Sequence, residues 1–261
     1  MKIERGHFAI ELGPLTSTIY DRGDWKKEDE YPGWQMFADE CEKLLSFALS
    51  HGVFEMYLPE LTRRASQRDS ALNELRVAFF FERNHFPVTA WRPIGEPPKE
   101  GEFTIAFPTG ESIFVEVKSP GWEMELSQAQ RLAGRTKEPK YQNGEGHMIA
   151  NEEAIVFAID KAYPKYSASQ RNLLVVADDL FVSLEHGTEI WADAALYDPR
   201  REGKFANAAC SRLGGVGLFW WSSQRDQMHY EMPLYINAHT EQSCALPAVF
   251  VQAFHGKTLD G

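Results

Sequence analysis

Two charged residues on one short stretch have the types and spacing for metal-assisted chemistry. The segment 112–118 reads Ser-Ile-Phe-Val-Glu-Val-Lys, with Glu116 and Lys118 two positions apart. In a β-strand, alternate side chains share a face, so these two would lie about 6 to 7 Å apart along it. At that spacing a carboxylate can bind a metal ion while the lysine reaches a neighbouring water or phosphate. A half-solvated strand whose lysine protects an exposed edge explains the same pattern without chemistry.

A second acidic residue, Glu102, stands at the start of a neighbouring strand-like segment, 102–107. The residues Pro108-Thr109-Gly110 favour a turn between this segment and 112–118, which predicts an antiparallel hairpin. Glu102 and Glu116 share a face only if they lie opposite each other. That register pairs Phe107 with Glu111, and a shift by one residue would put the two acids on opposite faces.

A third acidic residue, Glu74, lies in a segment predicted to be a helix over residues 70–83. Asp69 or Ser70 is the expected N-cap, and apolar residues recur on one stripe of the helix. Glu74 would then lie beside that stripe in the first turns. A glutamate there is also favoured by the positive end of the helix dipole, without any functional role.

Helix, strand, turn and strand in this order resemble the core of the PD-(D/E)XK, or restriction-endonuclease-like, nuclease superfamily. The resemblance rests on Glu74, on Glu102-Phe103 and on the segment Val115-Glu116-Val117-Lys118-Ser119-Pro120, and it extends more loosely to about residue 180. It implies an α/β fold with a restriction-endonuclease-like core, in which helices flank a mixed central sheet. It also implies a site that binds Mg²⁺, or Mn²⁺, and cleaves phosphodiester bonds.

The resemblance assigns roles to the residues that match. Glu102 and Glu116 would be metal ligands, with the Val117 carbonyl as a further oxygen, and Glu74 would add a ligand or hold a metal-bound water. Lys118 would orient the attacking water or offset charge at phosphorus. The family usually has Pro-Asp where this chain has Gly101-Glu102. Because glutamate is longer, we expect a less tightly held metal and higher activity with Mn²⁺ than with Mg²⁺.

Substrate contacts are expected from the polar segment 119–150 and from the helix after it. Arg131 and Arg135 belong to a basic run that suggests a phosphate-contacting flap, although a solvated loop without a partner explains it equally well. Lys161 and Lys165 lie four residues apart near the end of a predicted helix, 151–163. The resemblance favours Lys161 as a polar residue facing the metal, with a surface lysine as the alternative.

The remaining pattern predicts an N-terminal helical extension, residues 1–66, packed on a nuclease-like α/β unit, residues 67–261. The extension contains a strand at 8–12 and helices at 32–49 and 59–65. The α/β unit adds strands at 88–91, 172–177, 216–221 and 229–236 and a helix at 188–197, with 172–177 lying beside the Glu116 strand through a right-handed crossover.

Composition limits the partners. The 261 residues carry a net charge of −11, so nucleic acid must bind at a local basic patch, helped by a divalent cation. Three cysteines without a Cys-x-x-Cys pair argue for a reducing compartment, and the N-terminus lacks the apolar core of a signal peptide. We therefore expect a cytoplasmic protein with no membrane segment.

Three functional classes follow. We favour a metal-dependent nuclease acting on nucleic acid, DNA rather than RNA. The alternatives are a catalytically inactive nuclease-fold module that binds nucleic acid or protein, and an interaction protein in which the four charges are surface residues. The pattern leaves the oligomeric state open, with a homodimer as one alternative.

Overall fold

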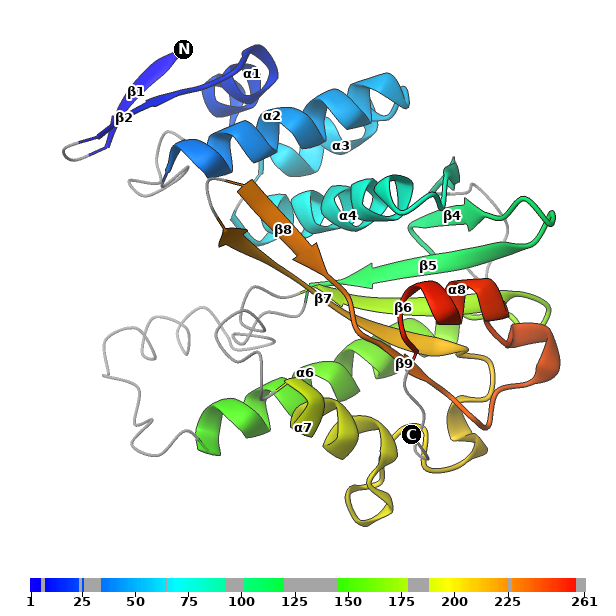
Figure 1. Ribbon diagram of the computed structural model, residues 1–261. Helices are drawn as coiled ribbons and strands as arrows, with labels where there is room; N and C mark the ends of the chain where they lie inside the picture. Colours follow the sequence, from blue (N-terminus) through cyan, green and yellow to red (C-terminus); the bar gives the residue numbers. More distant parts are fainter. Residues whose placement is uncertain are drawn as a thin grey trace. The chain divides into compact units, whose positions relative to one another are not determined.

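The computed structural model describes residues 1–5, 8–23, 25, 34–63, 65–92, 101–119, 145–177, 188–224 and 227–256. The chain forms two compact units (Figure 1). The first contains residues 1–91 and 222–230, and the second contains residues 92–221 and 231–261. This division differs from the expected boundary at residue 66, because the helix that carries Glu74 shares its core with the helices before it.

The first unit is mainly helical. Its elements are the antiparallel strands β1 (Lys2–Arg5) and β2 (Phe8–Glu11), the helices α1 (Pro14–Arg22), α2 (Gln35–Ser50), α3 (Phe54–Leu61) and α4 (Ala65–Arg83), and the strand β3 (Val88–Trp91). One core cluster joins residues of α1, α2, α3 and α4, including Ile19, Leu44, Tyr57 and Leu72. The predicted β2, α2 and β3 are confirmed, whereas α1 was not predicted.

Helix α4 begins earlier than the sequence pattern indicated. It starts at Ala65, so Asp69 and Ser70 lie inside the helix and do not cap it. The same shift replaces the helix predicted at 59–65 by α3, which ends at Leu61. Glu74 consequently lies in the third turn, beyond the reach of the helix-dipole effect that was its alternative explanation.

The second unit contains a mixed sheet. Its strands are β4 (Phe103–Ala106), β5 (Ser112–Lys118), β6 (Arg171–Ala177), β7 (Gly215–Gln224) and β9 (Leu234–Ile236). Neighbours follow the order β4, β5, β6, β7, with β9 also paired to β7. The β4–β5 and β7–β9 pairs are antiparallel, and β5, β6 and β7 are mutually parallel. The expected mixed α/β architecture is confirmed at this level.

One predicted strand is divided in two. The segment 229–236 forms the end of β8 (Gln227–Glu231) and then β9, with Pro233 between them. Proline has no backbone N–H for a sheet hydrogen bond, which explains the break.

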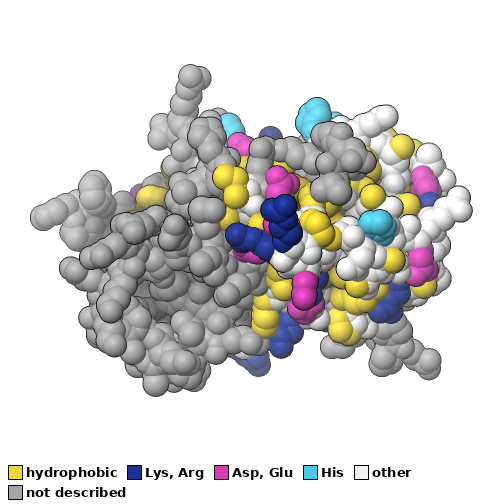
Figure 2. Space-filling view, turned by 90° about the horizontal axis from the view of Figure 1, so that it is seen from below, with side chains coloured by type: hydrophobic (Ala, Val, Ile, Leu, Met, Phe, Trp, Pro, Cys, Tyr) yellow, Lys and Arg dark blue, Asp and Glu magenta, His cyan; other side chains and the backbone are white. Residues whose placement is uncertain are grey.

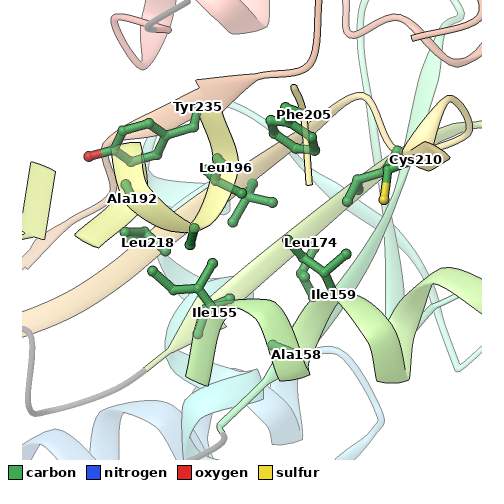
Figure 3. Close-up of a cluster of buried hydrophobic side chains, with 14 of the residues drawn as sticks. Ile155, Ala158, Ile159, Leu174, Ala192, Leu196, Phe205, Cys210, Leu218 and Tyr235 are labelled. Atoms are coloured by element: carbon green, nitrogen blue, oxygen red, sulfur yellow. The ribbon is translucent and has the colours of Figure 1, made fainter. Parts of the chain in front are cut away.

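Helices cover one face of this sheet. Helix α6 (Glu145–Ala162) ends in the 3-10 turn η2 (Tyr163–Lys165), and helix α7 (Thr188–Ala192) continues into the π-helical turn η4 (Asp193–Tyr197). Buried side chains from α6, α7 and η4 pack on Leu174 and Leu218 of β6 and β7 (Figure 3). Figure 1 shows α6 and α7 together on this side. The short helix α8 (Ala248–Ala253) contacts the β4–β5 hairpin through the rings of Phe250 and Phe107.

In the described part of the chain, no helix has the length and apolar composition needed to cross a membrane. Cys41, Cys210 and Cys244 are all buried free thiols.

Candidate functional site

The hairpin of β4 and β5 has the predicted register. Phe103 lies opposite Val115, and Ala106 lies opposite Ser112. Beyond the strand end the Phe107 N–H donates to the Glu111 carbonyl at 2.9 Å, which leaves 108–110 as the loop. Gly110 has a φ of +84°, a conformation that glycine adopts without strain. The register needed for Glu102 and Glu116 to share a face is therefore confirmed.

Gly101 allows the residue after it to approach β5 closely. Its φ is +101°, and a Cβ atom there would lie 2.7 Å from the Val115 carbonyl oxygen. The Glu102 N–H donates to that same oxygen at 2.7 Å. A side chain at position 101 would push this segment away from β5. Glycine at 101 therefore allows the Glu102 backbone to hydrogen-bond to Val115.

The parallel pairing with β6 identifies the face on which Glu116 lies. Glu116 is opposite Leu174, and Leu174 packs in the core cluster beneath α6 and α7 (Figure 3). Paired residues share a face of a sheet. Glu116 therefore points to the side that carries α6, while Val115 and Val117 are buried on the opposite side.

The Glu116 carboxylate is fully enclosed, with 0% of its side chain exposed. The ammonium groups of Lys118 and Lys165 both contact its Oε1 atom. Its Oε2 atom is also buried and has no hydrogen-bond partner among the described residues. A half-solvated strand does not explain this arrangement, because the Glu116 side chain is not exposed to solvent.

Glu102 lies beside the same lysine. Its Oε1 atom is 3.8 Å from Lys118 Nζ, and its Oε2 atom is 3.5 Å from Arg92 Nε. Burial raises the pKa of Glu102, and the negative charge of Glu116 raises it further, while Lys118, Arg92 and Lys165 act in the opposite direction. Burial is therefore the main cause of the rise, and the negative charge of Glu116 adds to it.

Lys165 reaches the site from outside the hairpin, in the turn that follows α6. Burial alone would lower its pKa, but the hydrogen bond and charge of Glu116 outweigh burial and raise it. The next residue, Tyr166, is buried, and its hydroxyl has no hydrogen-bond partner among the described residues. Burial raises the pKa of Tyr166, with a further contribution from Glu116.

The structure brings together some predicted residues and not others. Glu102, Glu116 and Lys118 form one cluster in the second unit, whereas Glu74 belongs to the first unit, where it is buried. Lys161, the lysine that the resemblance favoured, lies over the Phe157 ring, with 4.9 Å between its Nζ and the ring centroid. The lysine of this segment that contacts Glu116 is Lys165. Arg131 and Arg135 lie outside the described residues.

Sequence reasoning missed Lys165, Arg92 and Tyr166. The spacing of Lys161 and Lys165 marked both lysines, and Pro164 signalled that the helix ends between them. Nothing in the sequence pointed to Arg92. Its backbone has a φ of +35°, an uncommon conformation for a non-glycine residue, and its N–H donates to the Glu102 carbonyl at 2.6 Å.

The donor atoms present suit a hard divalent cation. No group of three or more His, Cys, Asp or Glu residues with the geometry of a metal site occurs among the described residues. Mg²⁺, however, is commonly held by one or two carboxylates and keeps several waters. The carboxylates of Glu102 and Glu116 would supply such oxygens, and the Oε2 atom of Glu116 has no hydrogen-bond partner among the described residues. The Val117 carbonyl, which accepts from Lys118 Nζ at 3.3 Å, would supply a further one. The residues therefore fit Mg²⁺ or Mn²⁺ better than Zn²⁺, which prefers nitrogen and sulfur ligands.

No family model, curated protein or solved structure matches the chain.

Proposed function

We propose that this protein hydrolyses phosphodiester bonds of nucleic acid, DNA in preference to RNA, with Mg²⁺ or Mn²⁺ as cofactor. The proposal includes the restriction-endonuclease-like identity of the second unit. The observation that carries it is the fully buried Glu116, which has two lysines on one oxygen and, among the described residues, no hydrogen-bond partner on the other.

Stability alone is a poor explanation for this carboxylate. Desolvating a charged group costs several kcal/mol, on the order of 3 to 5, unless every polar atom finds a partner. Here the Oε2 atom has none among the described residues, although two lysines lie close by. Buried charges with unused coordination capacity concentrate at functional sites.

The residues of the cluster would divide the work. Glu102, Glu116 and the Val117 carbonyl would hold the cation. A bound Mg²⁺ or Mn²⁺ lowers the pKa of its water and polarises the phosphate oxygens. The Lys118 side chain is 26% exposed, and its ammonium contacts Glu116, lies 3.8 Å from Glu102 and donates to the Val117 carbonyl at 3.3 Å. It would orient the nucleophilic water or neutralise charge at phosphorus.

Because the protein is acidic, nucleic acid would have to bind at a local site and not over a broad surface. Figure 2 shows one face of the molecule, on which the described Lys and Arg side chains alternate with Asp and Glu and do not form a broad basic area. With a net charge of −11, phosphate affinity must come from short-range contacts and a divalent cation.

A binding module without catalysis is the second candidate, and one observation favours it. Arg92, Lys118 and Lys165 already surround the two carboxylates. These three cationic side chains could bind a phosphate with no metal present.

A cleavage assay separates the two. Supercoiled plasmid and a single-stranded RNA are incubated with the wild-type protein in Mg²⁺, Mn²⁺ or EDTA. The proposal predicts nicking of the plasmid that requires a cation, is faster with Mn²⁺ than with Mg²⁺ and exceeds cleavage of the RNA.

Glu116→Gln should abolish this cleavage. Glu111→Gln is the matched control, because Glu111 lies on the same hairpin and pairs with Arg171 at 2.7 Å, away from the cluster. Nucleic-acid binding without cleavage under every condition would favour the module and overturn the enzyme.

A further inference from the structure

The side chains around Glu116 carry more positive than negative charge even without a bound metal ion. In the part of the chain that the structure describes, two carboxylates, Glu102 and Glu116, lie among three cationic side chains, those of Arg92, Lys118 and Lys165. The same charges act together on Glu102, whose pKa responds to Glu116 and to all three cations. A divalent cation entering this site would therefore add positive charge to a cluster that already has an excess of it.

Lys165 is the cationic residue of the cluster that comes from the turn after α6 and not from the region of the hairpin. Arg92 and Lys118 adjoin the hairpin strands, whereas Lys165 comes from the turn after α6 and reaches the same Oε1 atom that Lys118 already contacts. Its side chain is 30% exposed, so its ammonium has a path to solvent that the carboxylate lacks. Two ammonium groups therefore lie on one oxygen of Glu116, while the Oε2 atom has no hydrogen-bond partner among the described residues.

We propose that a divalent cation and a phosphodiester bind to this site as a cooperative pair, and that Lys165 sets the strength of their coupling. Without phosphate, the Lys165 ammonium opposes the cation at Glu116. With phosphate bound, the ammonium pairs with the added negative charge, and the opposition disappears. This inference rests on the proposed function, and it makes Lys165 a positioning residue with a measurable role.

The physical basis is short-range electrostatics in a site of low water content. Charges within a few ångströms interact strongly where burial reduces dielectric screening. Coupling between two ligands is reciprocal, so DNA must tighten cation binding by the same factor by which the cation tightens DNA binding. Removing the Lys165 charge should strengthen binding of the cation alone and weaken the coupling.

The test measures cation affinity, not turnover. Mn²⁺ is titrated calorimetrically into the full-length protein, first alone and then with a saturating phosphorothioate DNA duplex, whose backbone resists hydrolysis. Lys165→Met and Lys165→Gln both remove the charge, so the test survives if one of them folds poorly. Lys165→Arg keeps the charge. Lys204→Met is the matched control, because Lys204 pairs with Asp160 at 2.5 Å and is 23% exposed.

The neutral variants should bind Mn²⁺ about tenfold more tightly than wild type without DNA, a typical coupling for two linked ligands. In these variants the DNA-dependent gain in Mn²⁺ affinity should fall by a similar factor. Lys165→Arg and Lys204→Met should match wild type.

Two results would overturn the inference. In the first, the neutral Lys165 variants bind Mn²⁺, but no more tightly than the wild-type protein does. This result would exclude the role of Lys165 and leave the proposed function standing. Absence of Mn²⁺ binding in every variant, with and without DNA, removes both.

Discussion

Two buried glutamates in this chain are paired in opposite ways. In the first unit, Glu40 is 1% exposed, and Arg76 donates to both of its oxygens at 2.9 and 2.8 Å. The Tyr230 hydroxyl adds a third hydrogen bond at 2.8 Å. In the second unit, Glu116 is as deeply buried, yet both of its cationic partners lie on one oxygen and the other is bare.

The contrast separates a structural ion pair from the one that we propose to be functional. Arg76 forms a planar, two-point pair that satisfies the Glu40 carboxylate, which is the geometry expected where a charge is buried for specificity of packing. Glu116 has spare coordination capacity, which a folded protein retains at a cost. Burial of an acid alone therefore does not indicate function, and our proposal depends on the incomplete pairing of the Glu116 carboxylate.

The largest expected effect is on the stability of the first unit. Arg76→Ala should lower the free energy of unfolding by about 3 to 5 kcal/mol, because Glu40 would keep an unpaired buried charge. Urea unfolding followed by circular dichroism measures the loss. Arg83→Ala, an exposed arginine on the same helix, is the control. Equal effects of the two substitutions would show that the Glu40 pair is not the stabilising feature.

The next effect is on catalysis. Lys118→Ala should slow cleavage about 100-fold, the typical contribution of one positioned electrostatic group. Its Mn²⁺ affinity should be retained, since Lys118 supplies no ligand oxygen, whereas Glu116→Ala should lose both cleavage and Mn²⁺ binding. Single-turnover kinetics and calorimetry give the two quantities, with Lys204→Ala as the control. Cleavage by Lys118→Ala at the wild-type rate would show that Lys118 only protects the edge of the strand and has no role in cleavage.

A smaller effect compares the two glutamates directly. Glu116→Gln should change the free energy of unfolding by about 1 kcal/mol or less, since Lys118 and Lys165 are partly exposed and can turn toward solvent. Glu40→Gln should cost about 3 kcal/mol, because Arg76 cannot leave its buried position. Urea titration in EDTA tests both. A larger loss for Glu116→Gln than for Glu40→Gln would contradict the distinction.

The smallest effect concerns pH. The pKa of Glu102 is raised on folding, so the folded state binds its proton more tightly than the unfolded state does. The resulting stabilisation is present below the unfolded pKa, near 4.5, and is lost as pH rises through the folded pKa. Glu102→Gln removes this loss, so the variant should gain stability relative to wild type as pH rises above 4.5.

Urea unfolding between pH 4 and 8 in EDTA measures that difference, with Glu111→Gln as the control. A stability difference between Glu102→Gln and wild type that stays constant with pH would exclude a raised pKa of Glu102 in the folded state.

The hairpin was predictable because its signals are local. Alternating residue types predicted β5 from Ser112 to Lys118, and three turn residues set the loop length. Loop length and alternation together leave one register that buries the apolar face, which places Glu102 opposite Glu116. Two of the acids could therefore be brought together from the sequence alone.

The cationic partners that those acids have outside the hairpin strands could not be predicted, because their positions depend on backbone geometry that the sequence pattern does not show. Helix α6 ends at Ala162, and Lys165 reaches Glu116 from the 3-10 turn that follows it. Periodicity alone does not show where the α-helix gives way to that turn. Arg92 depends on an uncommon backbone conformation. The Tyr230 bond to Glu40 spans 190 residues, a separation at which periodicity carries no information.

The central claim is that the bare Glu116 oxygen is a cation ligand, whereas the satisfied Glu40 carboxylate is not. Anomalous diffraction from crystals grown with Mn²⁺ and a phosphorothioate duplex tests this directly. We predict an anomalous peak about 2.0 to 2.6 Å from the Glu116 Oε2 atom, the range of oxygen bonds to hard cations, with a Glu102 oxygen in its coordination shell. No peak should occur at Glu40. A cluster without anomalous density, with Lys118 and Lys165 still on Glu116, would contradict the claim.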